Sequence, residues 1–496
     1  MTTTRPEPTR PEPTRPEPTR PESTRPEPTR PESTRPEPAL TAPTGGAAPG
    51  RILLLACAVT FLAFLDATVV NVAFPDLRRA FPEVSLARLT WVVSGYAVLF
   101  AALLAAAGRL ADTLGRRALF IGSAFAFTLT SLAASAAPTA ELLIAARALQ
   151  GAAAAGMIPA ALGLVLAHTP PGRRAAALGA WGAAGGLAAA VGPTLGGLLV
   201  EAWDWRAIFL VNVPLGLAVC WAAARSVPRD ERTVRRLPDP VGTGALALGI
   251  GGVVAGLSQG EEWGWTDPAV LGLVVGGALS AALALYRSRR HPAPAVDRDL
   301  WNDPVFARSN LGAMLFGAAM YAWLLIGPSY LIARWDYSVL EAGFGVTPGA
   351  VLATAGALVV GRRVPARLQW AAVAVGSLLF AANALLLWGW ADASTSYAQV
   401  FLPAGLLGGL GIGVVLTALS TAASATLPPE RFAAGTGLLM TARQLGGALG
   451  IAATAALLTG AGDHWRGVFL LTAVAALGAA AVGCAMRVRD PVSRPE

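Results

Sequence analysis

Charged residues are scarce in this sequence of 496 residues, and lysine is absent altogether. Charged side chains make up 14% of the chain, whereas an ordinary soluble domain carries roughly a quarter. All 38 basic residues are arginine, which we interpret, with the excess of alanine and glycine, as coding bias without functional content. The mean hydropathy is +0.54. Apolar runs of about twenty residues recur from Ile52 to Met486, the length that spans a hydrocarbon core of about 30 Å. The composition excludes an ordinary soluble protein and predicts an integral membrane protein.

Cysteine and histidine are also rare, with three of each. Cys57, Cys220 and Cys484 fall inside apolar runs without a C-x-x-C spacing, and the histidines lie far apart in connecting segments. We therefore expect no disulfide, no metal site and no cofactor. A membrane enzyme would need nucleophiles, metal ligands or acids clustered at one depth, and a sensor would need a soluble signalling domain. The sequence offers neither, which favours a transporter.

The first fifty residues are a low-complexity tail of T-R-P-E-P and T-R-P-E-S repeats followed by an Ala-, Pro-, Thr- and Gly-rich stretch. Frequent proline favours polyproline II, and alternating Arg and Glu keep the segment solvated. We expect a spacer or a repeat expansion without function there, with a partner docking site as the alternative, and no core. A cleavable signal peptide would need an apolar region near residue 1, so residues 52–75 are expected to act as an uncleaved first helix.

Apolar runs separated by polar breaks predict fourteen membrane helices, and hence an all-α integral membrane fold. The expected ranges are 52–75, 90–108, 118–137, 141–167, 175–200, 207–225, 241–258, 269–286, 309–332, 342–360, 370–390, 398–420, 435–460 and 467–486.

The net charge of +8 does not indicate a nucleic-acid partner, because the arginines lie in short clusters between apolar runs and not on one patch. With a cytoplasmic N-terminus, most of these arginines fall in the inner connections, which sets the topology. The outer connections carry only Arg78, Arg79, Arg88, Arg206, Arg334 and Arg466. Tryptophans gather at the predicted outer ends, where an amphipathic ring prefers the interface. We predict a multi-pass protein of a bacterial inner membrane with both termini in the cytoplasm.

A short internal repeat relates the fourth connection and fifth predicted helix to the twelfth connection and thirteenth predicted helix, at an offset of 258 residues (428 minus 170). The matching residues are Pro170, Pro171, Arg173, Ala175, Ala176 and Gly179 with Pro428, Pro429, Arg431, Ala433, Ala434 and Gly437. The fifth and the thirteenth predicted helices, which follow the two copies, both run outward. This common direction fits two parallel six-helix halves with two helices inserted between them. The predicted division is a tail over 1–50, a first half over 51–225, a central segment with two extra helices over 226–304, a second half over 305–487 and a cytoplasmic tail over 488–496.

Three charged residues fall inside apolar runs, where an ionisable group costs about 2.5 to 3.5 kcal/mol on insertion scales. They are Asp66 in the first predicted helix, Arg147 in the fourth and Arg443 in the thirteenth. A carboxyl group beside a mobile guanidinium can take up and release a proton as the pair separates and rejoins. The alternative is a static ion pair that holds helices together.

The fifth predicted helix has a face nearly free of side chains, formed by Gly182, Gly186, Ala190, Pro193 and Gly197. Small residues let membrane helices approach closely, and a proline adds a kink at which a rocking bundle can bend. Ordinary structural packing explains this stripe almost as well.

The segment GRLADTLGRR, from Gly108 to Arg117, predicts a tight inner turn with Asp112 among its arginines. A positively charged inner loop needs the arginines but not the acid. We expect Asp112 either to cap the next helix or to latch to the end of a partner helix in one conformation.

Six segments together resemble signatures of the major facilitator superfamily, and within it the fourteen-helix branch of drug/proton antiporters. GRLADTLGRR is similar to the superfamily signature between helices 2 and 3, RALQG (147–151) to the proton-linked signature of helix 4, and GPTLGG (192–197) to the antiporter signature of helix 5. LDATVVNVAFP (65–75), WDWRAIFLVNVP (203–214) and RQLGGALG (443–450) resemble segments of the fourteen-helix branch. The six occur in order and cover the chain from about residue 51 to residue 487.

The resemblance implies alternating access around a central cavity, with an inward proton exchanged for an outward substrate and the proton gradient as the energy source. It assigns proton coupling to Asp66 and Arg147. The residues that it places at the substrate cavity or in the surrounding helix packing are Asn71, Gln150, Gly192, Pro193, Gly196, Gly197, Arg443 and Gln444. The residues that it places at an inner gate are Gly108, Arg109, Asp112, Gly115, Arg116 and Arg117.

Two departures from the family pattern bear on the substrate. The second-half counterpart of the inner loop, GRRVPAR (361–367), lacks an acid at the place of Asp112, and no carboxylate lies deep in helices 9 to 14. We therefore expect neutral, anionic or singly charged lipophilic substrates. The predicted protein is a monomeric, proton-coupled exporter of lipophilic drugs or antibiotics. The alternative is a dedicated exporter of one endogenous metabolite, which an apolar cavity would serve equally well.

Overall fold

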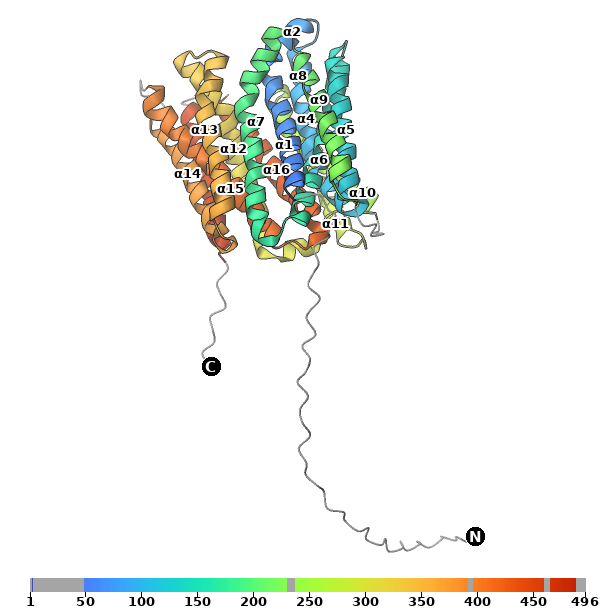
Figure 1. Cartoon of the computed structure of the whole chain (residues 1–496). Helices are drawn as coiled ribbons and strands as arrows, with labels where there is room; N and C mark the ends of the chain where they lie inside the picture. Colours follow the sequence, from blue (N-terminus) through green and yellow to red (C-terminus); the bar gives the residue numbers. More distant parts are fainter. Residues whose placement is uncertain (1, 3–48, 230–236, 391–395, 459–463, 488–496) are drawn as a thin grey trace. The chain divides into compact units, whose positions relative to one another are not determined.

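Long helices occupy every segment in which the sequence predicts a membrane span (Figure 1). The computed structural model describes residues 2, 49–229, 237–390, 396–458 and 464–487, so nearly all of the predicted tail over 1–50, and all of the predicted tail over 488–496, lie outside the described residues. The described residues from 49 onward belong to one compact unit. Within the described part, 13 helical segments are long and apolar enough to cross a membrane. The all-α membrane fold is confirmed.

The long helices are α1 (Pro49–Val72), α4 (Trp91–Leu114), α5 (Arg116–Ser135), α6 (Ala140–His168), α7 (Arg174–Ala202), α9 (Asn212–Ser226), α10 (Pro240–Trp263), α11 (Pro268–Ser288), α12 (Pro304–Trp335), α13 (Val339–Arg363), α14 (Gln369–Trp390), α15 (Leu402–Ala425), α16 (Phe432–Leu458) and α17 (His464–Ala485). Short helices are α2 (Phe74–Ala80), α3 (Leu86–Leu89) and α8 (Ala207–Leu210). Single turns are η1 (Pro171–Arg173), η2 (Arg298–Asn302), η3 (Ala366–Leu368), η4 (Tyr397–Phe401) and η5 (Pro429–Arg431).

The predicted span 435–460 is observed as α16, which is not among the 13 apolar segments. The reason is that Arg443 and Gln444 lie near its middle. α16 packs against α4, α6 and α12, so protein surrounds much of this helix.

Several helix boundaries differ from the predicted ones. α4 continues past residue 108 to Leu114, and α12 begins at Pro304 instead of 309, because the backbone next to a charged side chain still needs its intrahelical hydrogen bonds. The first helix is shorter at its end than predicted. α1 ends at Val72, and Pro75 lies in the first turn of the separate helix α2, since proline fits the first turn of a helix better than its interior.

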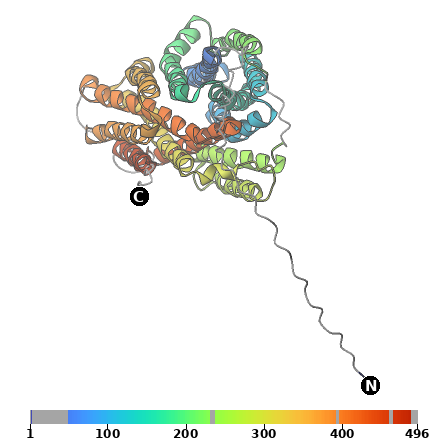
Figure 2. The ribbon, with the colours of Figure 1, turned by 60° about the horizontal axis from the view of Figure 1, so that its bottom comes forward.

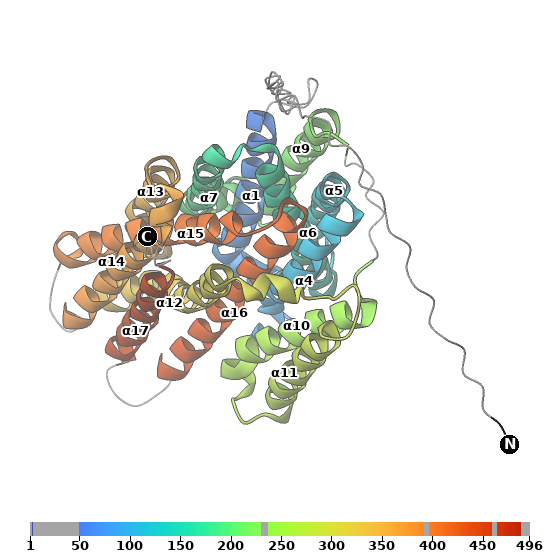
Figure 3. The same ribbon diagram turned by 90° about the horizontal axis from the view of Figure 1, so that it is seen from below.

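The helices form two groups with a hairpin beside them (Figures 1 and 3). In the first group, α1 packs against α6, α7 and α9, and α6 packs against α4 and α5. In the second group, α12 packs against α15, α16 and α17, and α15 packs against α13 and α14. The groups meet along α4 and α16 and along α7 and α13. The hairpin of α10 and α11 flanks the first junction, because α10 contacts both α4 and α16.

One end of the bundle, which we call the base, carries the start of α1, the turn at Gly115 and the turns η1 and η5 (Figures 1 and 2). The predicted arginine-rich connections that the structure describes lie at this end. The opposite end, which we call the distal end, carries α2 and α8. The turns η1 and η5 belong to the predicted repeat, and each leads directly into a long helix, α7 or α16.

The outer surface of the bundle carries large apolar side chains, among them Leu54, Leu248 and Leu279. Water would penalise such a surface, whereas lipid tails solvate it.

The hairpin is tied together at its base by Asp239, which caps α10. Its carboxylate accepts hydrogen bonds from the backbone N–H of Val241 (3.2 Å) and from Nε (2.8 Å) and Nη2 (2.9 Å) of Arg287 in α11. The hydrogen bonds from Arg287 lower the pKa of Asp239 to about 2.

Candidate functional site

Asp66 of α1 and Arg147 of α6 form a buried ion pair. Nη1 of Arg147 donates to Oδ2 of Asp66 at 2.5 Å, and the two side chains are 1% and 0% exposed. α1 and α6 pack against each other, which brings together residues 81 positions apart. A pair this buried is costly to break, because either partner alone would be an uncompensated charge.

Polar side chains from α6 and α9 occupy the other oxygen of the carboxylate. Oδ1 of Asp66 accepts from Nε2 of Gln150 (3.0 Å) and from Nδ2 of Asn212 (2.8 Å). Ser131 of α5 accepts from both of these amides. Oε1 of Gln150 in turn accepts from Nη1 of Arg147 at 2.7 Å. Gln150, one of the candidate cavity residues, therefore belongs to this network and does not line the cavity.

Sequence reasoning missed Asn212 as a partner of Asp66, and it missed Ser131 as the hydroxyl that joins Gln150 to Asn212. Asn212 lies in the segment 203–214 that carries part of the family resemblance, and it is 0% exposed within an apolar run. An uncharged polar residue in such a run was the available signal, although nothing local indicates which helix it contacts.

Arg147 separates Asp66 from the large cavity. Arg147 lines this cavity, whereas Asp66 does not. Its guanidinium lies over the ring of Tyr96, 4.5 Å from the centroid, and its Nε donates to the carbonyl of Val92 at 3.1 Å. A proton that enters from the cavity meets Arg147 first, so access to the carboxylate requires this side chain to move.

The cavity has a volume of about 1050 Å³ and lies between the two helix groups. Its walls come from α1, α4, α6 and α7 on one side and α12, α13, α15 and α16 on the other, and they are mostly apolar, with the rings of Trp181 and Trp323 among them. Its lining includes Asn71, Glu201 and Phe344, which are exposed near the distal end. The cavity thus reaches the distal surface, and it is large enough for a drug-sized molecule.

Of the remaining candidate cavity residues, Pro193 and Gly197 of α7 and Arg443 and Gln444 of α16 line the cavity. Oε1 of Gln444 accepts from the hydroxyl of Tyr321 at 2.5 Å, a partner that the sequence did not indicate.

Gly192 and Gly196 have a different role, because they face α1 and not the cavity. A Cβ at Gly192 would overlap the hydroxyl of Thr68, and one at Gly196 would lie 3.2 Å from Cβ of Val69. These two glycines therefore let α7 pack closely against the helix that carries Asp66.

At the base, Asp112 latches the first group to the second. It pairs with Arg116 at 2.6 Å and accepts hydrogen bonds from the backbone N–H of Ala433 (3.3 Å) and Ala434 (2.7 Å) at the start of α16. A carboxylate is favoured there, because the first N–H groups of a helix lack intrahelical partners. Of the two contacts considered for this acid, the structure shows the one to the end of a partner helix.

The other candidate gate residues surround this latch. Arg116 also donates to the carbonyl of Pro429, and Arg117 donates to the carbonyl of Ala224 at 2.8 Å. A Cβ on Gly108 would overlap the carbonyl oxygen of Ala433, so only glycine lets α4 and α16 touch there. Gly115 has a φ of 110°, which a glycine adopts without strain between α4 and α5.

Arg109 helps to hold the two groups together at the base through Asp297, a residue that sequence reasoning missed. Asp297, in the connection between α11 and α12, lies 3.5 Å from Nη1 of Arg109 in α4 and 2.9 Å from Nε of Arg431 in η5. The side chain of Asp297 is 7% exposed. Because its two arginine partners belong to different groups, Asp297 bridges these groups from a third segment. No local pattern marks this aspartate, because its two partners come from distant parts of the chain.

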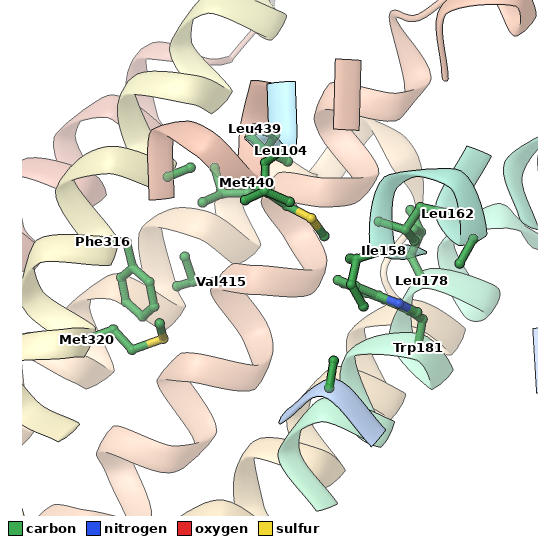
Figure 4. Packing of buried hydrophobic residues seen from close by; sticks show 14 of the residues in the cluster. Leu104, Ile158, Leu162, Leu178, Trp181, Phe316, Met320, Val415, Leu439 and Met440 are labelled. Carbon is green, nitrogen blue, oxygen red and sulfur yellow. The ribbon is translucent and has the colours of Figure 1, made fainter. Parts of the chain in front are cut away.

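An apolar layer of Ile158, Leu178, Trp181 and Met440 joins the two groups beside the cavity (Figure 4). Met440 of α16 points toward Ile158 of α6, and Leu178 and Trp181 of α7 lie beside Ile158. All four side chains are buried and belong to one hydrophobic cluster. Together with the latch at Asp112, this layer keeps the two groups in contact at the base while the cavity separates them toward the distal end.

Comparison with known proteins agrees with this architecture. The family description "Major Facilitator Superfamily" matches residues 56–450 and 367–496. The chain therefore belongs to the major facilitator superfamily, a family of transporters and not of enzymes.

Its relatives include the puromycin resistance protein pur8 of Streptomyces alboniger, 37% identical over 82% of this chain and 82% of that protein. The methylenomycin A resistance protein of Streptomyces coelicolor is 33% identical over 92% of this chain and 95% of that protein. The predicted resemblance to the branch of drug-resistance transporters is confirmed, and the chain is a multi-pass membrane protein.

Among solved structures, the crystal structure of the human organic anion transporter MFSD10 (TETRAN) matches with a TM-score of 0.66. The match covers 86% of this chain and 99% of that chain at 17% identity. At this identity the likeness shows the fold alone.

Proposed function

We propose that this chain is a proton-coupled exporter of lipophilic compounds, antibiotics among them, that works by alternating access. The observation that carries the proposal is the buried pair of Asp66 and Arg147 at the wall of a large apolar cavity. A buried carboxylate and a guanidinium that faces the substrate space are the parts that such an exchange needs.

The arrangement of contacts supports an outward-facing state of the cycle. The groups touch at the base through Asp112 and the apolar layer, and the cavity reaches exposed residues at the distal end. With the base in the cytoplasm, as the arginine distribution predicts, both termini are cytoplasmic and the cavity faces outward. In the opposite state, the base contacts separate and the distal ends close, with the first and second groups acting as the two rocking halves.

Proton uptake would act through charge. Protonation of Asp66 removes the charge that holds Arg147, which then keeps only neutral partners, namely the amide oxygen of Gln150 and the carbonyl of Val92. The guanidinium is left without a counter-ion at the cavity wall, and relief of this unfavourable state can drive a rearrangement of α1 against α6.

The cavity walls and the relatives support the proposed substrate class. Two relatives are named for resistance to puromycin and to methylenomycin A, which makes antibiotics the first compounds to examine. The apolar lining and the volume of about 1050 Å³ also fit other lipophilic molecules of drug size.

The test is transport by the purified full-length chain in proteoliposomes with an imposed pH gradient. Ethidium and puromycin serve as first probes, and an internal pH dye reports proton movement. We expect accumulation that requires the gradient, that an uncoupler abolishes, and that is accompanied by proton flux in the opposite direction.

Transport that continues unchanged when the gradient is collapsed would contradict proton coupling, although it would leave the exporter role intact. If the folded protein carries neither probe but moves a single compound of the host cell, the dedicated exporter is the correct function.

A further inference from the structure

Arg443 carries a charge that the cavity does not neutralise. It lies near the middle of α16, is 8% exposed, and lines the large cavity beside Gln444. Within the described residues its guanidinium takes part in no hydrogen bond and no ion pair, and its buried Nε has no acceptor. Arg147, in contrast, has its carboxylate partner at 2.5 Å.

No other group that lines the cavity supplies the missing negative charge. Besides the two arginines, the only charged residue in the lining is Glu201, which is exposed near the distal end. The neighbouring Gln444 already accepts a hydrogen bond from Tyr321 through its Oε1.

On its other side, Arg443 borders a small cavity of about 20 Å³. The rest of this small cavity is lined by apolar side chains and by the hydroxyl-bearing Ser420 and Thr436. A carboxylate is therefore missing on both sides of the guanidinium.

The protein cannot relieve this charge by titration, because a guanidinium keeps its proton at any physiological pH. A buried cation without a partner is costly, so an anion that enters the cavity gains more from Arg443 than it would gain from an arginine at the surface. The guanidinium offers donors in a planar fork that matches a carboxylate. Trp181 and Trp323 in the same cavity offer apolar surface for the rest of such a molecule.

We propose that Arg443 is the site in the cavity that binds an acidic group, so that the preferred substrates are carboxylates with an apolar, aromatic or aliphatic body. This inference rests on the proposed function and narrows its substrate class. Because Arg443 belongs to the second group and Asp66 to the first, the substrate anion and the proton bind to different groups.

The experiment measures binding with no gradient, by isothermal titration calorimetry on the purified full-length chain in detergent. The probes are 1-naphthaleneacetate, its uncharged analogue 1-naphthaleneacetamide, and the cation 2-(1-naphthyl)ethylammonium. We expect wild type to bind the carboxylate at least tenfold more tightly than the amide, and the cation most weakly. Arg443→Gln should weaken carboxylate binding about 10- to 100-fold and change amide binding less than about threefold, as for a lost hydrogen bond to a charged group.

Arg443→Lys keeps the charge and should retain part of the preference for the carboxylate. Arg334→Gln makes the same substitution at an exposed position outside the cavity lining and should change neither affinity. If Arg443→Gln fails to fold, the order of the wild-type affinities for the three probes still tests the proposal.

A wild type that binds the ammonium probe as well as the carboxylate, or an Arg443→Gln protein that loses both probes equally, would overturn the proposal. Carboxylate binding at Arg443 without transport in proteoliposomes would refute the exporter role and leave the binding site standing. Proton-driven transport with no preference for carboxylates would refute the anion site at Arg443 and leave the exporter role standing.

Discussion

Replacing Asp66 by asparagine tests proton coupling most directly, because the substitution keeps the shape of the side chain and removes its charge. The carboxylate accepts from Arg147 on one oxygen and from Gln150 and Asn212 on the other. An asparagine in either orientation points its NH₂ group at a donor, and it leaves Arg147 without a counter-ion. Removal of one partner from a buried ion pair costs about 3 to 5 kcal/mol.

We expect the lower end of this range, about 3 kcal/mol, because Arg147 keeps two neutral acceptors and faces the cavity. The loss can be measured as the free energy of unfolding in detergent titrations. Transport in proteoliposomes should fall to the level that is seen without a proton gradient.

The double variant Asp66→Asn with Arg147→Gln separates a coupling pair from a static pair. It removes both buried charges, so most of the lost stability should return. If the pair only holds helices together, transport should return with stability. If the pair couples the proton, transport should stay independent of the gradient although the protein is stable.

Asp76→Asn is the matched control, since Asp76 pairs with the exposed Arg79 at 2.6 Å. A surface pair of this kind contributes between about 0 and 1 kcal/mol, so this variant should behave like wild type. Gradient-driven accumulation by Asp66→Asn at the wild-type level would refute the coupling role.

Three further predictions concern the base. Gly108→Ala should push α4 away from the carbonyl of α16 that it touches, so that a thiol reagent added at the base labels a cysteine placed in the apolar layer faster. Gly122→Ala in α5, where nothing lies within 4 Å, should not change this labelling, and equal labelling of the two variants would contradict the packing argument. Asp297→Asn should remove the ionic bridge to Arg109 and Arg431 and also raise the labelling of the cysteine in the apolar layer. A labelling rate equal to that of wild type would show that the bridge does not hold the base closed. Because the pKa of Asp239 is lowered to about 2, its hydrogen bonds with Arg287 stabilise the fold fully above the pKa of about 4 in the unfolded chain, and this stabilisation is lost only as the pH falls toward about 2. Asp239→Asn should therefore leave the shape of the transport profile between pH 5 and 8 unchanged.

The membrane-spanning helices and the charged residues within them could be read from the sequence. A bilayer demands about twenty apolar residues per span and penalises every charge, so Asp66, Arg147 and Arg443 stand out against their neighbours. The same reasoning misplaced helix ends, as at α4, where Asp112 lies inside the last turns of the helix.

The partners of these residues were decided by tertiary structure. Asn212 contacts Asp66 from 146 residues away, and Asp297 joins arginines on both sides of the groups' junction. Hydrogen bonds of this kind depend on which helices pack together and at what height, and helical periodicity carries no information about either.

The sequence by itself determined the membrane class, the family and which side chains are too polar for lipid, because these follow from local composition and motifs. Only the tertiary structure decided that both oxygens of Asp66 accept hydrogen bonds while Arg443 faces the cavity without a partner among the described residues, since pairing is a property of distances between distant segments. It also decided at which end the two groups touch, because small residues and one carboxylate at the base allow a contact that the cavity prevents elsewhere.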